Sequence, residues 1–365
     1  MPYDAPVIAD ARSALRSRFS PGAGVAYLDA ATYGLPPDTT VAAMHRALDM
    51  WQAGTAQWIG DWDRPAERAR VAFASLVGTV PERVTLLPQL SVGMGIVAAN
   101  LGPGDEIVVP DDEFTSVLFP LLLAKERGAT VREVPQPEVA DAIRPTTTHV
   151  AFSLVQMQTG RVAALADILD RAEAVGARVT VDATQGIPFV DVAPHLGRID
   201  HLLLSGYKHV LCPRGTSFLV HGRGDGSHLS PIAANWRAAD DPYGRYFGGP
   251  LTLAPDARRF DVSLAWLPWV GAVESLEALV TWKPTGAFDD VLAQSRSLAG
   301  RLGTKWEGAS LVCAPIRDAA GASDALAEAG VRASVRGTAI RCAPHVWTTD
   351  EDLDRAVEAL TPFLG

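Results

Sequence analysis

The stretch Leu202-Leu203-Leu204-Ser205-Gly206-Tyr207-Lys208-His209 begins as an apolar run and ends in a polar turn that carries one lysine. The apolar run has the length and composition of a short buried strand. Upstream, a second strand-like run, Thr180-Val181-Asp182-Ala183-Thr184-Gln185, also ends in polar side chains. Lysine is among the residue types least often buried, so a lysine between this strand and the apolar residues 210–213 is hard to explain as a solvated side chain. The two strand ends therefore predict a functional site.

Lys208 and Asp182 are the pair of side chains that pyridoxal phosphate (PLP) chemistry requires. The lysine forms a Schiff base with the cofactor, and the carboxylate keeps the pyridine nitrogen protonated. Ser205 and Tyr207 are expected to donate hydroxyl groups to the phosphate. Burial lowers the pKa of Lys208 and makes its amine a competent nucleophile. Taken alone, Asp182 is equally well explained as a turn residue at a strand end. Its combination with Lys208 favours the catalytic role for both residues.

A third polar turn, Gln89-Leu90-Ser91-Val92-Gly93, follows a strand-like run and opens an apolar helix. The backbone N–H groups and the dipole at such a helix start favour an anion. We therefore expect Leu90, Ser91 and Val92 to contact the cofactor phosphate. On its own, Ser91 is also an ordinary N-cap residue.

Two further residues are candidate contacts of the cofactor ring. Gln185 either hydrogen-bonds the phenolic oxygen of the cofactor or is a buried glutamine with another partner. Phe114 follows the strand expected at residues 105–109 and is a candidate to stack on the pyridine ring, although aromatic residues after strands more often belong to the core. His209 is either a substrate-facing group or a packed core histidine.

Arg341 is the candidate anchor for a substrate. It lies in the apolar strand-like run Ile340-Arg341-Cys342, where a guanidinium needs a partner. The α-carboxylate of an amino acid is a planar, bidentate partner, and an internal salt bridge is an alternative of comparable weight. Tyr33 and Trp236 are expected to contact the substrate as well. The aromatic residues of the segments 51–62 and 222–250 are equally well explained by packing.

Strand-like and helix-like runs alternate through the middle of the chain. Strands are expected at residues 83–87, 105–109, 131–134, 149–155, 178–182, 201–204 and 216–220. Helices are expected at residues 91–101, 116–127 and 165–174. This alternation predicts an α/β fold with a mostly parallel, seven-stranded sheet covered by helices. Ligands bind at the carboxyl ends of the strands in such sheets, which is where Asp182 and Lys208 fall.

The composition changes after a long loop at residues 222–250. The remaining chain predicts a smaller α+β domain, with a last helix at residues 350–360 that is capped by Thr348 or Thr349. We expect strands at residues 311–313, 331–335 and 339–342, and further helices at residues 264–282, 288–302 and 322–329. The proposed division is an N-terminal segment 1–24 that packs on the small domain, a PLP-binding large domain 25–255 and a small C-terminal domain 256–365.

Charge and cysteine content exclude several classes of function. The net charge of −10 over 365 residues, without a cluster of Lys and Arg, argues against a nucleic-acid partner. Three cysteines at unrelated spacings predict neither a disulfide framework nor a metal site, and they fit a reducing cytoplasm. The first residues lack an apolar signal region, and the longest apolar run, at residues 117–124, is too short to cross a membrane.

These motifs resemble those of fold-type I PLP enzymes of the class V aminotransferase superfamily, in the branch of kynureninase, isopenicillin N epimerase and C–S lyases. Tyr27-Leu28-Asp29-Ala30-Ala31-Thr32 is similar to the opening strand of that family. Residues 180–186 and 205–208 resemble its two cofactor motifs, and residues 337–344 resemble its carboxylate-binding strand. The resemblance runs through nearly the whole chain. It implies the cofactor PLP, an amino-acid substrate and a homodimer with shared active sites.

Three departures from the family pattern narrow the function. Cysteine desulfurases carry a nucleophilic cysteine before the carboxylate-binding arginine, and residues 321–339 contain none. Cys342 directly follows Arg341 in the strand and should point to the opposite face. Gln156 stands where the desulfurases have an Asn near the phenolic oxygen. Asp261-Val262-Ser263 stands where the family has a Gly-Thr pair that reaches the phosphate of the neighbouring subunit.

The resemblance and the missing cysteine together favour a C–S β-lyase that acts on a cysteine S-conjugate, as in specialised metabolism. An aminotransferase, an epimerase and a decarboxylating oxidative deaminase are the alternatives within the same superfamily. They differ in which bond at the substrate α-carbon is broken, and the sequence does not determine that geometry. A catalytically silent regulator of the same fold is disfavoured, because Lys208, Asp182 and Arg341 are all present.

Overall fold

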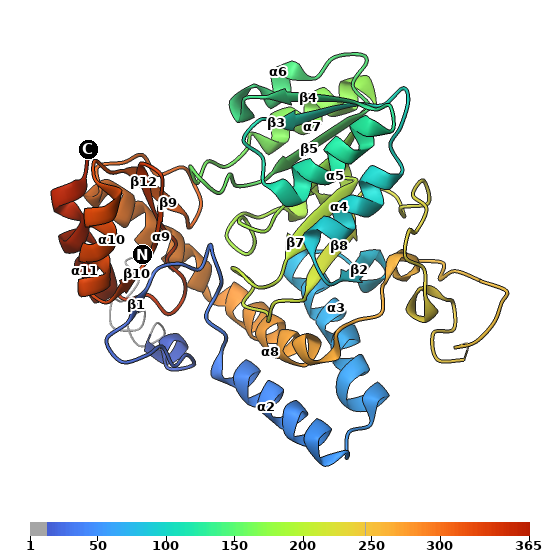
Figure 1. The fold of residues 1–365 in the computed structure, drawn as a ribbon, viewed down its shortest axis with the longest axis horizontal. Helices are drawn as coiled ribbons and strands as arrows, with labels where there is room; N and C mark the ends of the chain where they lie inside the picture. The colour runs from blue at the N-terminus through green and yellow to red at the C-terminus, as the bar shows by residue number, and fades with distance from the viewer. Residues whose placement is uncertain (1–12, 245) are drawn as a thin grey trace.

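The computed structural model describes residues 13–244 and 246–365. Its centre is one seven-stranded sheet (Figure 1). In spatial order the strands are β2 (Val84–Leu87), β8 (Ser217–His221), β7 (His201–Ser205), β6 (Arg178–Asp182), β5 (His149–Ser153), β3 (Glu106–Pro110) and β4 (Thr130–Val134). The five strands from β7 to β4 run parallel, and β8 is antiparallel to both β7 and β2. The predicted α/β fold with a mostly parallel seven-stranded sheet is confirmed.

Helices cover both faces of this sheet because apolar side chains alternate along its strands. In β7, Leu202 and Leu204 belong to one buried cluster, whereas Leu203 belongs to the other. Each fully buried leucine contributes roughly 1.5–3 kcal/mol to folding. The first cluster includes α3 (Arg64–Val77), α7 (Leu165–Val175) and α8 (Trp266–Trp282). The second includes α4 (Leu90–Ala99) and α5 (Thr115–Glu126).

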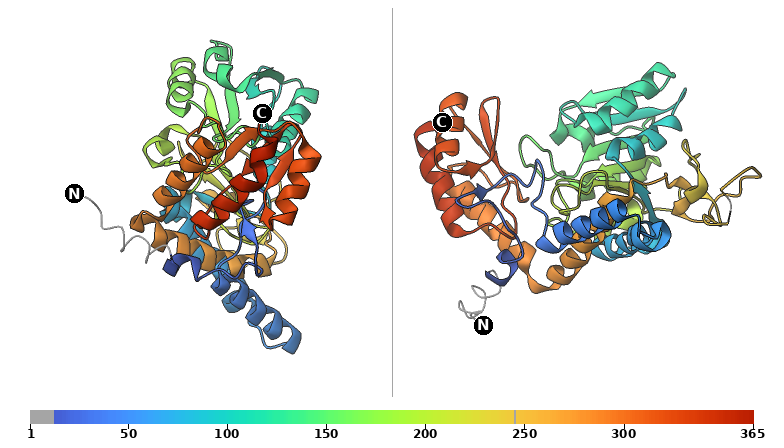
Figure 2. Two further views of the ribbon diagram at one scale, coloured as in Figure 1. Left: turned by 90° about the vertical axis from the view of Figure 1, so that its left-hand side faces the viewer. Right: turned by 60° about the horizontal axis from the view of Figure 1, so that its bottom comes forward.

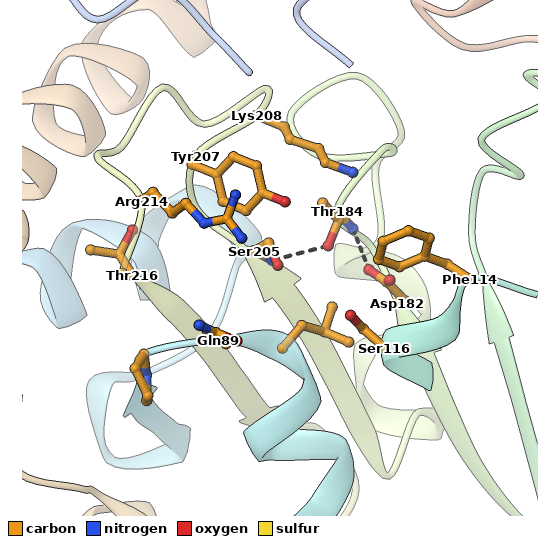
Figure 3. A pocket seen from close by; sticks show the side chains of 13 residues that line it. Gln89, Phe114, Ser116, Asp182, Thr184, Ser205, Tyr207, Lys208, Arg214 and Thr216 are labelled. Carbon is orange, nitrogen blue, oxygen red and sulfur yellow. Dashed lines mark hydrogen bonds between the residues drawn. The ribbon is translucent and has the colours of Figure 1, made fainter. Parts of the chain in front are cut away.

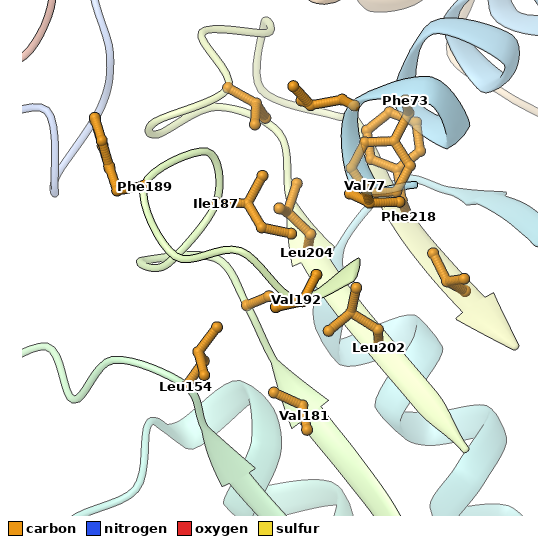
Figure 4. Packing of buried hydrophobic residues seen from close by; sticks show 14 of the residues in the cluster. Phe73, Val77, Leu154, Val181, Ile187, Phe189, Val192, Leu202, Leu204 and Phe218 are labelled. Carbon is orange, nitrogen blue, oxygen red and sulfur yellow. The ribbon is translucent and has the colours of Figure 1, made fainter. Parts of the chain in front are cut away.

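Figure 4 shows part of the first cluster, with Leu202 and Leu204 of β7 between Val181 of β6 and Phe218 of β8. The rings of Phe218 and Phe73 are stacked, with centroids 3.9 Å apart, which fastens α3 to β8. The helix α2 (Asp38–Ala53) packs on α8, and α8 packs on α3, so these three helices form a layer below the sheet in Figure 1. A short helix, α6 (Val139–Ala142), lies next to α7.

The C-terminal part has a sheet of its own. It is a three-stranded antiparallel sheet of β11 (Ser334–Arg336), β12 (Ala339–Cys342) and β9 (Val312–Pro315). Its helices are α9 (Ala287–Arg301), α10 (Ala319–Glu328) and α11 (Asp350–Leu360). Thr349 is the N-cap of α11 and forms a capping box with Asp352, which confirms one of the two predicted caps.

The described N-terminal residues lie against the C-terminal part (Figure 2). The strand β1 (Ala26–Tyr27) pairs in parallel with β10 (Val331–Arg332), and Asp29 forms a bridge with Ala343. The ring of Phe19 lies 5.1 Å from that of Trp347. Residues 1–12 of the predicted segment 1–24 lie outside the described residues, and the domain boundaries stay a prediction. No helix of the described residues is long and apolar enough to span a bilayer.

Candidate active site

Side chains from several strand ends line one cavity at the carboxyl edge of the sheet (Figure 3). Asp182 ends β6, Ser205 ends β7, and Lys208 lies in the turn after β7. Phe114, the residue directly before α5, lines the same cavity. Five of the residues expected to contact the cofactor therefore lie together with Asp182. They are Leu90, Phe114, Ser205, Tyr207 and Lys208.

The Lys208 amine is buried in this cavity, and its side chain is 7% exposed. Its Nζ lies 5.4 Å from the ring centroid of Phe114 and 5.9 Å from that of Tyr207. Burial, together with the charges of Arg341 and Arg336, lowers the pKa of Lys208 from 10.5 to about 8, and the charges of Asp182 and Asp29 oppose this shift. About a tenth to a quarter of this amine is therefore neutral between about pH 7 and 7.5, and the neutral amine is the nucleophilic form.

The Asp182 carboxylate is also buried, and among the described residues it has no partner within ion-pair distance. One oxygen accepts a hydrogen bond of 2.8 Å from the backbone N–H of Thr184. Burial raises the pKa of Asp182, while the hydrogen bonds with Thr184 and the charge of Lys208 lower it. A buried carboxylate and a buried amine that do not pair with each other leave room for a charged, flat group between them. The pyridine ring of PLP fits this requirement.

Gln185 lies behind this cavity, next to Met157 and Lys208. Its Nε2 donates to the backbone oxygen of Ala31 at 3.1 Å, and its Oε1 lies 2.8 Å from Nε2 of His209. Because His209 is fully buried, it is a packed core histidine that holds Gln185.

Glu113 is a buried residue next to the site that the sequence did not single out. Its carboxylate accepts hydrogen bonds of 2.7 Å from the backbone N–H groups of Phe114 and Ser153. Burial raises the pKa of Glu113 to about 7. Glu113 therefore fixes the position of the Phe114 ring.

The opposite end of the cavity is made by the start of α4 and by the turn after β7. Its walls are Gln89, Leu90, Ser205, Tyr207, Arg214 and Thr216. Ser91 and Val92, which we expected to contact the phosphate, are not among the lining residues. Arg214 and Thr216 are also part of the wall, although the sequence did not single them out as site residues. The run Pro213-Arg214-Gly215 was a usable signal, since it places a basic residue in a turn close to Lys208.

Arg341 is 1% exposed and faces the N-terminal segment. Its Nη2 donates to the hydroxyl of Thr32 at 2.7 Å and lies 3.3 Å from a carboxylate oxygen of Asp29. Burial and the charge of Arg336 lower the pKa of Arg341, and Asp29 opposes them. Its Nε has no hydrogen-bond partner among the described residues, although it is buried. The guanidinium thus has an internal ion pair and also an unused donor for a carboxylate.

A second, apolar cavity of about 640 Å³ adjoins the first. It begins at Thr32 and Tyr33, beside Arg341, and it shares Tyr207 and Arg214 with the cofactor cavity. Its remaining wall is largely apolar: Pro36, Val41, Met44, Leu48, Leu211 and Pro213. Of the expected substrate contacts, Tyr33 therefore lines a cavity next to the site.

Trp236 lines neither cavity. Its ring packs in an aromatic cluster with Trp58, Tyr243 and Tyr246. A role of Trp236 in substrate binding stays a prediction.

The two departures at Gln156 and Asp261 have structural explanations. Gln156 is buried and accepts hydrogen bonds from the backbone N–H groups of Gln158 and Thr159, so it holds its own loop. Asp261 is buried against Arg70, with 2.5 Å between carboxylate and guanidinium, and it accepts a hydrogen bond from the backbone of Leu86. Neither side chain is free to contact the cofactor.

None of the three cysteines lines the cofactor cavity. Burial raises the pKa of Cys313 to about 11 and that of Cys342 to about 12. Cys212 is buried at the edge of the apolar cavity, and burial raises its pKa strongly. Thiolate chemistry by any of them is disfavoured.

The fold, the strand-end Asp182 and the buried Lys208 define a PLP-dependent enzyme of fold type I. The chain belongs to the aminotransferase class-V family, whose model matches residues 26–234. Isopenicillin N epimerase of Streptomyces clavuligerus is 28% identical over 342 residues, which cover 82% of this chain and 84% of that protein. Kynureninase of Xanthomonas oryzae pv. oryzae is 26% identical over 306 residues, covering 76% and 71%.

Solved structures share the fold. The cysteine desulfurase CsdA of Escherichia coli superposes with a TM-score of 0.78 at 23% identity and covers 96% of this chain and 98% of its own. The cystine C-S lyase C-DES, in complex with cysteine persulfide, superposes with a TM-score of 0.80 at 22% identity, covering 94% and 99%. When bound, PLP withdraws electrons from the bonds at the α-carbon of an amino acid. Lys208, Asp182 and Phe114 are the residues that would hold its ring.

Proposed function

We propose that this enzyme is a PLP-dependent C–S β-lyase that acts on an L-cysteine S-conjugate with a sizeable apolar substituent on sulfur. The observation that carries this proposal is the apolar cavity of about 640 Å³ that shares Tyr207 and Arg214 with the cofactor cavity. Thr32, at the mouth of this cavity, is bonded to Arg341, and Tyr207, in its wall, precedes Lys208. A substrate held by its α-carboxylate at Arg341, with its α-carbon near Lys208, can extend its side chain into this cavity past Thr32 and Tyr207.

The chain's own residues supply the proton transfer. Lys208 is the only amine that lines the cofactor cavity within the described part of the chain, and its lowered pKa suits it to take the α-proton. The C–S bond then breaks with both electrons on sulfur, and the departing thiolate takes up a proton. Water completes the balance, since the remaining three-carbon unit is released as pyruvate and ammonia. The apolar cavity stabilises the thiol's organic group by excluding water from it.

Release of a free thiol, rather than transfer of sulfur to the protein, is supported by the cysteines. Of the three, only Cys212 touches either cavity, and its thiol is buried with a strongly raised pKa. A persulfide-forming desulfurase needs an accessible thiolate.

The test uses the PLP-loaded enzyme with S-benzyl-L-cysteine and S-methyl-L-cysteine. We expect equal amounts of thiol, pyruvate and ammonia, and a higher kcat/KM for the benzyl compound. Leu48→Asp, in the cavity wall, should raise the KM of the benzyl compound roughly tenfold, because it places a charge against the ring. Leu251→Asp, an exposed residue outside the cavity, is the matched control.

Epimerisation at the α-carbon is the second candidate, favoured by the 28% identity to isopenicillin N epimerase over most of both chains. It shares the α-proton step with the lyase. Exchange of the α-hydrogen in deuterium oxide without any thiol would favour the epimerase and contradict the lyase. Accumulation of a keto acid that retains sulfur would identify an aminotransferase, and oxygen uptake with carbon dioxide release would identify a decarboxylating oxidative deaminase.

We also propose that two copies form a homodimer with shared active sites in the cytoplasm. Trp51, an apolar side chain on α2 that is 62% exposed and lies outside the cavity wall, supports an interface close to the apolar cavity. Phe247, at 95% exposed in the loop that follows Trp236, is a further contact candidate. Sedimentation equilibrium of the native enzyme tests the dimer, and a monomer with full activity would contradict it.

A further inference from the structure

The cofactor cavity has one charged wall residue that no part of the chemistry above uses, Arg214. It lies at the end of the cavity made by Gln89, Leu90, Ser205 and Thr216, away from Asp182 (Figure 3). The other groups at this end are hydroxyls, an amide and the start of a helix, and none of them carries a full charge. A phosphate monoester carries nearly two negative charges at neutral pH.

We propose that Arg214 supplies the positive charge that binds the phosphate of the cofactor, and that the ring of Tyr207 holds its guanidinium in place. The guanidinium carbon of Arg214 lies 5.2 Å from the centroid of the Tyr207 ring, within the range of a cation–π contact. No carboxylate of the described chain lies within ion-pair distance of Arg214. Its charge is therefore available to a ligand.

The backbone around Arg214 is built to present it. The hydroxyl of Thr216 donates to the backbone oxygen of Pro213 at 2.8 Å and closes a tight turn. Gly215 has a φ of +104°, in the region that favours glycine, and a Cβ there would lie 3.2 Å from Pro268. The turn thus has a fixed shape, and Arg214 projects from it beside Tyr207.

The helix α4 supplies the second half of this binding site. Its N-cap residue Gln89 has an extended backbone and makes no side-chain capping hydrogen bond. The first N–H groups of a helix have no partners within the helix, and here they border the cavity at Leu90. Backbone N–H groups, the helix dipole and one guanidinium form a recurrent combination for phosphate.

Lys208 and Arg341, the two cations that the chemistry above uses, are engaged away from the phosphate end. Lys208 faces Phe114 and the reacting end of the site, and Arg341 is bonded to Thr32 and Asp29. Asp261 stands where the family has a Gly-Thr pair that reaches the phosphate of the neighbouring subunit. In this chain it is an anion that is paired with Arg70. Among the described residues that line the cavity, Arg214 is the one cation left for the phosphate.

The experiment measures equilibrium binding of PLP and of pyridoxal, which lacks the phosphate, to the apoenzyme by the change in tryptophan fluorescence. For Arg214→Ala we expect PLP to bind roughly 10- to 100-fold more weakly, while pyridoxal binds as it does to the native protein. Arg214→Lys should recover part of the loss, because it keeps the charge but not the planar fork. Inorganic phosphate should compete with PLP for the native apoenzyme and much less for Arg214→Ala.

Arg171→Ala is the matched control, since Arg171 is an exposed arginine on α7 whose one ion pair with a described residue is to the exposed Asp141. Unchanged PLP affinity in Arg214→Ala, or an equal loss for PLP and pyridoxal, would overturn the proposal. If Arg214→Ala lowers the melting temperature of the apoenzyme, Arg214→Gln is judged by the same comparison, because it keeps a long polar side chain. None of these binding measurements depends on which reaction the enzyme catalyses.

Discussion

Two groups of buried charges in this protein differ in whether their charges are matched within the chain. The closed cluster consists of the buried Asp63, Arg70, Arg237 and Asp261, together with the partly exposed Glu67. The open cluster consists of Asp182 and Lys208. In the closed cluster every carboxylate contacts a guanidinium, and one Arg70–Asp261 contact measures 2.5 Å. In the open cluster Asp182 and Lys208 have no ion-pair partner in the described chain.

The pKa values follow this difference. Burial raises the pKa of Glu67, but Arg70 and Arg237 lower it to about 2, so this carboxylate stays ionised. Burial lowers the pKa of Lys208 to about 8, and Asp182 compensates only in part. Matched buried charges serve the structure of the chain, whereas unmatched ones indicate where a charged ligand belongs.

The largest expected effect comes from removing the amine of the open cluster. Lys208→Ala should lower kcat/KM at least about 10³-fold, because the same amine attaches the cofactor and moves the α-proton. Its melting temperature should not fall, since an unmatched buried charge is removed. Steady-state kinetics and thermal melts measure both effects. Lys305→Ala, at a side chain that is 80% exposed, is the control. A Lys208→Ala enzyme with near-native turnover would contradict the assignment.

Removing a charge from the closed cluster should lower the unfolding free energy. Asp261→Asn leaves Arg70 buried without its nearest carboxylate, which is expected to cost about 3–5 kcal/mol of unfolding free energy. Urea denaturation measures this loss. Asp354→Asn breaks an exposed pair with Arg301 and should cost less than about 1 kcal/mol. Equal losses in the two variants would remove the distinction between matched and exposed pairs.

The pH dependence of stability separates the clusters further. The pKa of Lys208 is about 8 in the folded protein and 10.5 in an unfolded chain, so the unfolded state binds its proton more tightly. The unfolding free energy of the apoenzyme should therefore rise with pH between about 8 and 10.5, by about 3 kcal/mol. The measurement is denaturant unfolding at several pH values. Lys208→Met should lack this component, and identical pH profiles of the two proteins would refute the burial of a titrating amine.

The smallest effect is expected at Arg341. Arg341→Lys keeps the charge but loses the planar fork, so kcat/KM should fall roughly 10- to 100-fold, mainly through KM. An amine that lacks the α-carboxylate should react equally poorly with both enzymes, and this comparison is the control. If the variant discriminates against that amine as strongly as the native enzyme does, Arg341 is not the carboxylate anchor.

Much of the fold was predictable because its signals are local. Buried strands of Val, Ile and Leu alternate with helices, and the strands at residues 178–182 and 201–205 occur within a residue of the prediction. The antiparallel placement of β8 between β2 and β7 was not predictable, because strand direction depends on the path of the loops and not on the composition of the strand. The pairing of β1 with β10 joins residues far apart in the sequence and leaves no local signal.

The candidate site also has residues that the sequence predicts and residues that it does not. Asp182, Ser205 and Lys208 follow their strands directly, so the edge of a parallel sheet brings them together. Ser91 shows the limit of this reasoning, because the motif placed a helix start correctly but only Gln89 and Leu90 face the cavity. Glu113 and Arg214 were missed because their roles depend on which neighbour they face, Phe114 in one case and Tyr207 in the other.

Two backbone pairings attach the segment around Thr32 to the C-terminal part of the chain. They are the bridge from Asp29 to Ala343 and the pairing of β1 with β10. Gly34 completes this linkage on the other side, since its N–H donates to the backbone oxygen of Tyr207 and a Cβ there would collide with the backbone of Lys208. A rigid-body rotation of the C-terminal part would therefore also move the turn that carries Lys208. A substrate carboxylate that moves Arg341 would therefore also move Lys208, through Thr32 and the hydrogen bond between Gly34 and Tyr207.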